Sequence, residues 1–185
     1  MTENYVDKFI SAIQRKVNPE IIEKIDRNEL CIKEESKTSK NKKVIIKSMK
    51  KGCMAFNIDK HPREVYLFKE ETKVSDEIII YIKENKEIIV FIIEMKSDKI
   101  SSAFKQIKYG KIYIDFLIGI LEEEIGYEFH KEYRGYIFTT KCSEKHPTKI
   151  PKKIKATRKL GDIYLKSFPA NSNHDFRYLS LPIEY

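Results

Sequence analysis

The central part of the chain alternates between short apolar runs and polar breaks. Ile78–Ile82 and Ile88–Ile93 are apolar at almost every position and flank the polar segment Glu84–Glu87. Continuous apolar runs are typical of strands buried on both faces, so these two segments predict a hairpin at the centre of a sheet. Residues 101–124 then place apolar side chains at helical spacing, which predicts a long helix with a broad buried face.

The flanking segments predict smaller elements. Residues 2–17 and 19–27 show helical spacing, and Asn18-Pro19 suits the start of the second helix. Further strands are predicted at 30–32, 44–48, 53–58, 65–68, 136–140, 163–165 and 176–181. Residues 36–43 and the stretch after residue 140 are predicted to be mainly loop. The pattern predicts one α/β domain over 1–185, with its core at about 19–140 and a basic extension at 141–185.

Composition narrows the class of protein. The chain has 185 residues, 41% of them hydrophobic, and no apolar run approaches the roughly 20 residues that span a bilayer. Its first residues carry acids where a signal peptide needs a basic flank. Three widely spaced cysteines without a CxxC pair give no zinc or disulfide motif. The sequence therefore predicts a cytoplasmic protein with no membrane partner.

Positive charge is concentrated in two tracts. Of the 36 lysines and arginines, fourteen lie in the acid-free segments 37–51 and 145–159, whereas the acids outnumber the bases elsewhere. Such tracts indicate a polyanion as the partner, although charge runs are also common on solvated surfaces. The residues predicted to contact nucleic acid are Lys42, Lys43, Lys50, Lys51, Lys149, Lys152, Lys153, Lys155 and Arg158.

A carboxylate and an ammonium group follow directly on the second apolar run. Glu94 and Lys96 lie two residues apart, so a strand that continues past Ile93 places both side chains on one face. Asp76 precedes the first apolar run. If the numbers of paired residues sum to 170, as an odd loop centred on Asn85 gives, Asp76 lies opposite Glu94, whereas a sum of 171 turns them apart.

Two facing carboxylates beside one lysine predict a metal site. The charges of Asp76 and Glu94 repel each other, and Mg²⁺ or Mn²⁺ relieves the repulsion because hard divalent cations take oxygen ligands. The carbonyl of Met95 is a natural third ligand. Lys96 can orient a water or offset charge on a phosphate, so the group supports phosphodiester hydrolysis. The competing interpretation is that the strand ends at Ile93 and Asp76 lies in an ordinary turn.

Asp76, seventeen further residues and then Glu94-Met95-Lys96 in a buried hairpin resemble the PD-(D/E)xK nuclease superfamily. Gln106 and Tyr109, on the helix that follows, resemble the QxxY element of its RecB-like branch, in which these residues help to line the site. The resemblance implies the restriction-endonuclease-like fold, an αβββαβ core with a mixed central sheet flanked by helices. It implies Asp76 and Glu94 as metal ligands and Lys96 as the catalytic lysine.

The sequence departs from the family's pattern at one position, and a second position of the pattern is not assigned to a residue. Ser75 stands where the family often has proline, and no choice is made among Glu20, Glu23 and Glu29 for the glutamate that many members add from their first helix. The resemblance implies a Mg²⁺-dependent endonuclease of restriction, phage defence or repair, favours DNA over RNA, and is compatible with a homodimer or a partner subunit. The alternatives are a catalytically inactive nucleic-acid-binding module on the same fold and a small interaction protein.

Overall fold

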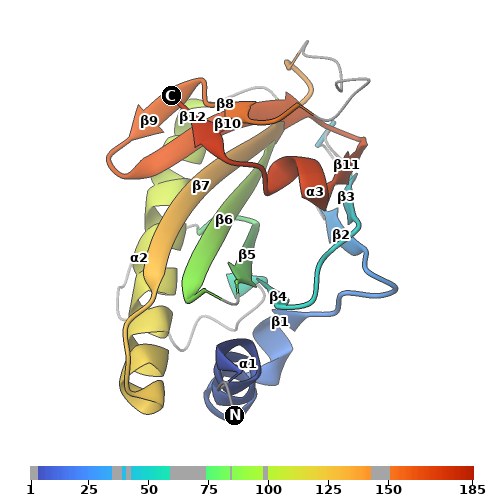
Figure 1. Ribbon diagram of the computed structural model, residues 1–185. Coiled ribbons are helices and arrows are strands. Elements are labelled where there is room, and N and C mark those ends of the chain that lie inside the picture. Colours follow the sequence, from blue (N-terminus) through green and yellow to red (C-terminus); the bar gives the residue numbers. More distant parts are fainter. Residues whose placement is uncertain are drawn as a thin grey trace, which may run out of the picture.

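A seven-stranded mixed sheet runs through the protein in the order β1-β4-β5-β6-β7-β10-β9 (Figure 1). The structure is a computed structural model that describes residues 4–34, 39–40, 43–58, 74–83, 85–97, 100–142 and 151–185. The sheet's strands are β1 (Ile22–Glu23), β4 (Cys53–Phe56), β5 (Glu77–Ile82), β6 (Glu87–Lys96), β7 (His130–Thr139), β9 (Arg158–Leu160) and β10 (Ile163–Pro169). Strand β7 is parallel to both β6 and β10, and the other pairs are antiparallel.

Each face of this sheet is covered by other elements. Helices α1 (Tyr5–Lys16) and α2 (Ser101–Ile125) pack on one face, and a three-stranded sheet with the short helix α3 (Phe176–Leu179) packs on the other (Figure 1). The smaller sheet consists of β2 (Leu30–Lys33), β3 (Lys43–Lys47) and β11 (Asn173–Asp175). Strands β8 (Ile154–Lys155) and β12 (Ile183–Glu184) form a separate parallel pair. The predicted α/β class and mixed central sheet are confirmed.

The two-sided covering explains the continuous apolar runs of the central hairpin. Ile78 and Ile92 belong to the core under α1 and α2, whereas Ile79 and Ile93 belong to the core under the smaller sheet. Successive residues of a strand point to opposite faces, so both faces of these strands need apolar side chains. The prediction of a buried central hairpin is confirmed. Among the described helices, none has the length and apolar character needed to cross a membrane.

The predicted helix at 19–27 is wrong. Only Pro19–Ile21 form a turn of 3₁₀ helix, after which β1 pairs with β4. Arg27 and Asn28 then adopt φ angles of 47° and 63°, and the backbones of Asp26 and Glu29 bond to each other across them. Residues at positive φ make a two-residue hairpin turn and cannot continue an α-helix, so this segment turns back toward β2.

The C-terminal region also differs from the sequence-based prediction. Residues 176–181 are not a strand, because Phe176–Leu179 form α3, capped by the Asp175 carboxylate that accepts from Arg177 N at 2.8 Å. Buried Arg134 of β7 donates through Nη1 to the carbonyls of Leu179 (2.8 Å) and Leu181 (2.7 Å), which holds this segment against the sheet. The stretch predicted as loop after residue 140 contains β8 and β9. The predicted strand at 65–68 lies outside the described residues.

Candidate active site

The β5–β6 hairpin has the register that brings the candidate carboxylates together. Paired positions sum to 170, as in Glu77 with Ile93 and Ile82 with Ile88. Lys83 N donates to Glu87 O at 2.8 Å across a three-residue loop, and Lys86 has a φ of 63°. A left-handed residue at the end of a three-residue loop is a common way to close such a hairpin. Of the two registers weighed from the sequence, the structure has the one that sets Asp76 opposite Glu94.

Asp76 and Glu94 occupy a position at which facing side chains approach closely. The β5–β6 ladder ends at Glu77–Ile93, and Asp76 and Glu94 are the next positions beyond it. Alternation along β6 puts Glu94 on the same face as Ile92, which packs under α2. The charge of Asp76 raises the pKa of Glu94, so the two carboxylates lie close together.

The segment before β5 leaves the ladder at this point. Met95 N donates to Asp76 Oδ2 at 2.5 Å, so a side chain replaces the next backbone partner. The N–H and C=O of one strand residue point the same way, so the Met95 carbonyl is also directed to the Asp76 side. The side chain of Met95 packs in the opposite core. Backbone geometry thus agrees with the expectation of Met95 as a carbonyl ligand.

Glu94 is a buried carboxylate in an unusual electrostatic setting. Its side chain is 0% exposed, and the groups that interact with its carboxylate include the Lys96 side chain and the backbone of Asp76. The Lys96 ammonium forms an ion pair with Oε1 and is itself 20% exposed. Burial, and then the charge of Asp76, raise the pKa of Glu94 to about 8. Strand β6 continues through Lys96, so the competing interpretation that it ends at Ile93 is wrong.

This arrangement fits a hard divalent cation. A buried carboxylate beside a second carboxylate is costly to ionise unless cations compensate the charge, and Mg²⁺ prefers oxygen ligands while keeping several waters. Asp76, Glu94 and the Met95 carbonyl would hold the ion. In the part of the chain that the structure describes, no group of three or more His, Cys, Asp or Glu side chains is placed to hold a metal. None of Glu20, Glu23 and Glu29 therefore completes a three-carboxylate site.

Gln106 and Tyr109 of α2 have different positions. Buried Gln106 donates from Nε2 to the carbonyl of Val74 at 3.3 Å, which ties the helix to the segment just before Asp76. Half-buried Tyr109 has its ring 5.5 Å from the Lys105 ammonium on the helix surface. The structure thus brings Gln106 to the base of the candidate site, where it positions the Asp76 segment, and shows Tyr109 in contact with Lys105.

Gly110, the weak point of the predicted helix, sets how closely α2 approaches the Asp76 segment, a role that the sequence pattern did not predict. A Cβ at this position would lie 2.5 Å from Ser75 Oγ and 2.7 Å from Ile92 Cγ2, and Ser75 is fully buried. The buried hydroxyl leaves no room for a side chain, so only glycine permits this contact. A glycine in the middle of a predicted helix was the available signal, because glycine there is otherwise unfavourable.

Replacing Gly110 with valine is expected to destabilise the protein by about 1–3 kcal/mol, because the added methyl groups overlap Ser75 and Ile92. Thermal unfolding should show a lower Tm, and the displaced Asp76 segment should weaken Mn²⁺ binding. Gly119→Ala is the matched control, since a Cβ there meets nothing within 4 Å, and it should be neutral or stabilising by up to about 1 kcal/mol. Equal Tm values for the two variants would contradict this account of Gly110.

Several predicted nucleic-acid contacts lie at the same end of the sheet as Glu94. Arg158 of β9 is level with Ile92 of β6, two residues before Glu94, because the strand pairs Arg158–Leu165, Leu165–Gly135 and Gly135–Ile92 connect them across the sheet. Three strand spacings, or about 14 Å, separate the two strands. Its guanidinium also lies 4.9 Å from the ring centre of Phe104 in the first turn of α2. Lys152, Lys153 and Lys155 are exposed on the approach to Arg158.

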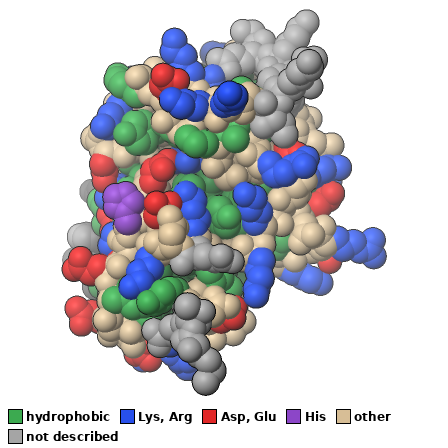
Figure 2. All heavy atoms as spheres, viewed as in Figure 1, with side chains coloured by type: hydrophobic (Ala, Val, Ile, Leu, Met, Phe, Trp, Pro, Cys, Tyr) green, Lys and Arg blue, Asp and Glu red, His purple; other side chains and the backbone are tan. Residues whose placement is uncertain are grey.

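The first basic tract is divided between the two ends of the sheet. Lys40 and exposed Lys43 lie near the Glu94 end, because Lys40 N donates to Oγ of Ser97, the residue directly after β6. The side chain of Asn171 connects the two lysines, since it accepts from Lys43 N and donates to the Lys40 carbonyl. Lys50 and Lys51 lie at the opposite, hairpin end, where Lys51 pairs with Asp7 of α1 at 3.7 Å. Lys42 and Lys149 lie outside the described residues. Figure 2 shows basic side chains over β8, β9 and β10 and along the side of β2 and β3.

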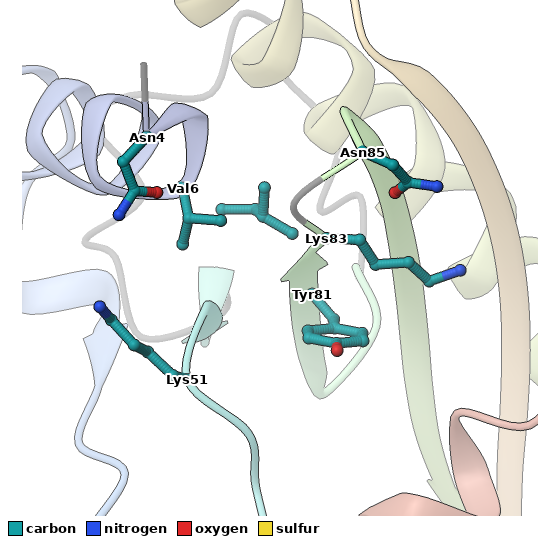
Figure 3. Close-up of a pocket in the computed structure, with 7 residues that line it drawn as sticks. Asn4, Val6, Lys51, Tyr81, Lys83 and Asn85 are labelled. Carbon is teal, nitrogen blue, oxygen red and sulfur yellow. The ribbon is translucent and has the colours of Figure 1, made fainter. Parts of the chain in front are cut away.

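A pocket at the hairpin end is separate from the candidate site. It has a volume of about 400 Å³ and is lined by Asn4, Val6, Lys51, Tyr81, Ile82, Lys83 and Asn85 (Figure 3). Its two lysines already have acidic partners, Asp7 and Glu87. The pocket lies beside the hairpin loop, at the other end of β5 and β6 from Asp76 and Glu94.

Comparisons with models of known protein families, with curated proteins and with solved structures give no match.

Proposed function

We propose that this protein is a metal-dependent nuclease that hydrolyses phosphodiester bonds, with DNA as the favoured substrate. The observation that carries the proposal is the closeness of Asp76 to fully buried Glu94 at the end of β6, with the Lys96 ammonium paired to Glu94. Two carboxylates close together at a strand end, one of them fully buried with the Lys96 ammonium beside it, suit a divalent cation, because the charge of Asp76 disfavours ionisation of Glu94 and a cation would offset it.

Each residue has a role that follows from its position. Asp76, Glu94 and the Met95 carbonyl would hold Mg²⁺ or Mn²⁺, which when bound supplies Lewis-acid stabilisation of the phosphate and lowers the pKa of a water. Lys96 is 20% exposed, so its ammonium can reach a phosphate and offset the charge that develops there. In hydrolysis a water oxygen bonds to phosphorus, the bond to the leaving sugar oxygen breaks, and that oxygen takes a proton.

The order of elements supports the resemblance to the PD-(D/E)xK superfamily. Helix α1 comes first, and after the intervening 3₁₀ turn and strands β1, β2 and β3, the antiparallel strands β4, β5 and β6, helix α2 and strand β7, parallel to β6, complete the αβββαβ order that the resemblance implies. The first helix of this series is α1 rather than the expected segment 19–27. The preference for DNA and a setting in restriction, phage defence or repair rest on this resemblance.

A catalytically inactive nucleic-acid-binding module is the second candidate. The observation that favours it is the incomplete ligand set, because Asp76 and Glu94 have no third His, Cys, Asp or Glu ligand in the described chain. Exposed Lys152, Lys153 and Arg158 at the same end of the sheet would suffice for binding without cleavage.

Cleavage assays distinguish the two candidates. Single- and double-stranded DNA and RNA are incubated with the protein in Mg²⁺, Mn²⁺ or EDTA, alongside Asp76→Asn and the control Asp162→Asn. Asp162 is an exposed carboxylate paired with Lys111 on α2 and lies outside the site. Cutting that needs metal and is lost only in Asp76→Asn supports the nuclease. Binding without cutting by the folded wild type, under all metal conditions, rejects it in favour of the binding module.

Replacing Arg158 with alanine is expected to weaken binding to a DNA duplex about 3- to 10-fold and to lower the slope of log Kd against log salt by roughly one, the value for one lost phosphate contact. Lys51→Ala is the control, because Lys51 lies at the hairpin end and pairs with Asp7. Fluorescence anisotropy at several salt concentrations measures both. If the two substitutions weaken DNA binding equally, binding depends on the net charge of the protein and not on the position of Arg158.

A further inference from the structure

Helix α2 carries three large apolar side chains on its outer face. Ile112, Phe116 and Ile120 are 63%, 72% and 41% exposed, and their spacing of four residues puts them on one side of the helix. Ile114 and Ile118 of the same helix are buried against the sheet. The exposed stripe therefore faces away from the sheet, along the outer edge of the molecule where α2 runs (Figure 1).

The charges that continue this stripe have opposite signs at its two ends. Exposed Lys105 and Lys108 precede it, and exposed Glu123 follows it. Lys108 lies eight residues before Phe116 and Glu123 seven residues after, so the two charges are nearly equidistant from the stripe's centre. In an antiparallel second copy of α2, the order of charges is reversed. Lys108 then meets Glu123 of the second copy, and Ile112 meets Ile120 of the second copy.

We propose that the outer face of α2 is a homodimer interface in which two copies pack antiparallel about a two-fold axis at Phe116. A two-fold interface uses the same patch on both subunits, so the patch must be complementary to itself. The stripe meets this condition because it is apolar at the centre and carries opposite charges at its ends. A parallel arrangement would set Lys108 against Lys108 and Glu123 against Glu123, which repel.

A second copy suits the stripe better than a polyanion. Nucleic acid would be repelled by Glu123 and would leave Phe116 in contact with solvent, whereas an apolar partner removes that surface from water.

The proposed dimer does not depend on the proposed function, but it fixes where two candidate sites would lie. Lys96 precedes the start of α2 at Ser101, which is fifteen residues, or about 22 Å of helix, from Phe116. An antiparallel pair places the two starts at opposite ends, about 45 Å apart. Each copy would thus carry a separate site.

Sedimentation equilibrium over a range of concentrations tests the dimer. The wild type should rise from 21.9 kDa toward twice that mass, and Phe116→Asp should raise the dimer Kd at least about tenfold. Its circular dichroism spectrum should match that of the wild type, and so should its Tm when both are measured at a concentration at which the wild type is monomeric. Tyr185→Asp is the control, because Tyr185 is equally exposed, at 74%, but lies outside the stripe. A wild type that stays at 21.9 kDa at every concentration overturns the proposal, as does a dimer unaffected by Phe116→Asp.

Charge reversal tests the antiparallel arrangement independently. Lys108→Glu and Glu123→Lys should each weaken the dimer, because either change leaves positions 108 and 123 of the two copies with the same charge. The two-fold axis repeats this contact, so the repulsion occurs twice in each dimer. The double variant restores opposite charges and should bring the Kd back to within about threefold of the wild type. Additive weakening in the double variant would overturn the antiparallel pairing. None of these residues belongs to the candidate active site, so failure of the dimer leaves the proposed function untouched.

Discussion

Replacing Lys96 with alanine is expected to slow metal-dependent cleavage by about 10²–10³-fold with little change in the Kd for uncut DNA. A group that stabilises charge developing in the transition state, and not in the bound substrate, lowers the rate when removed without weakening binding. The ammonium of Lys96 lies beside the inner carboxylate of the candidate site and is partly open to solvent, as such a role requires. Single-turnover cleavage in Mg²⁺, with binding measured in Ca²⁺, separates the two quantities.

Lys83→Ala is a closely matched control for Lys96→Ala. Lys83 is also a partly exposed lysine that pairs with a glutamate of β6, Glu87, but it lies at the hairpin end of the strand. Its removal should leave the cleavage rate within about twofold of the wild type, since an exposed ion pair contributes at most about 1 kcal/mol to stability. If both variants cleave equally well, Lys96 has no catalytic role. If both variants bind DNA poorly, the two lysines act only through charge.

Glu94→Gln is expected to stabilise the metal-free protein at alkaline pH. The folded-state pKa of Glu94 is raised to about 8, so folding favours the protonated acid. Below the unfolded pKa both states are protonated, and the full stability is retained. As the pH rises from about 5 to above 8, first the unfolded and then the folded carboxyl group ionises, and the free energy of unfolding should fall by an amount on the order of 3 kcal/mol. Glutamine keeps the neutral form at every pH. Its Tm in EDTA at pH 8.5 should therefore exceed that of the wild type by roughly 6–12 °C.

The same pair of proteins reports on the metal. Mg²⁺ or Mn²⁺ should raise the Tm of the wild type at pH 8.5, because a ligand that binds only the folded state stabilises it, and the gain should be largely lost in Glu94→Gln. The matched control is Glu128→Gln at an exposed position, which should follow the wild type with and without metal. A Tm of the wild type that is independent of pH in EDTA, or that metal raises equally in Glu94→Gln, would contradict the assignment of Glu94.

The hairpin and its carboxylates could be predicted because the evidence for them is local. Two apolar runs around a short polar segment determine a central hairpin, and the residue numbers themselves limit Asp76 and Glu94 to facing or diverging. The choice between these registers depended on the loop, in which Lys86 takes a left-handed conformation. Neither a turn type nor a register can be read from apolar spacing alone.

The errors arose where distant residues override local preference. Helical spacing in 19–27 is real, but pairing of Ile22 and Glu23 with β4 and the turn at Arg27 and Asn28 decide the conformation. The apolar residues of 176–181 alone suggest a strand, whereas Arg134, more than forty residues away, binds the carbonyls that end α3. Hydrogen bonds between segments far apart in sequence have no signature within either segment.

Residue type and spacing along single segments were enough to predict which strands are central, which residues carry the candidate chemistry and where positive charge is concentrated. The full burial of Glu94 and the fit of Gln106 and Gly110 against the Asp76 segment depend instead on how distant segments pack. The same packing also decides that Ile112 and Phe116 of α2 face solvent rather than the core. Burial, close approach and exposure depend on which surfaces meet, and a one-dimensional pattern does not contain that information.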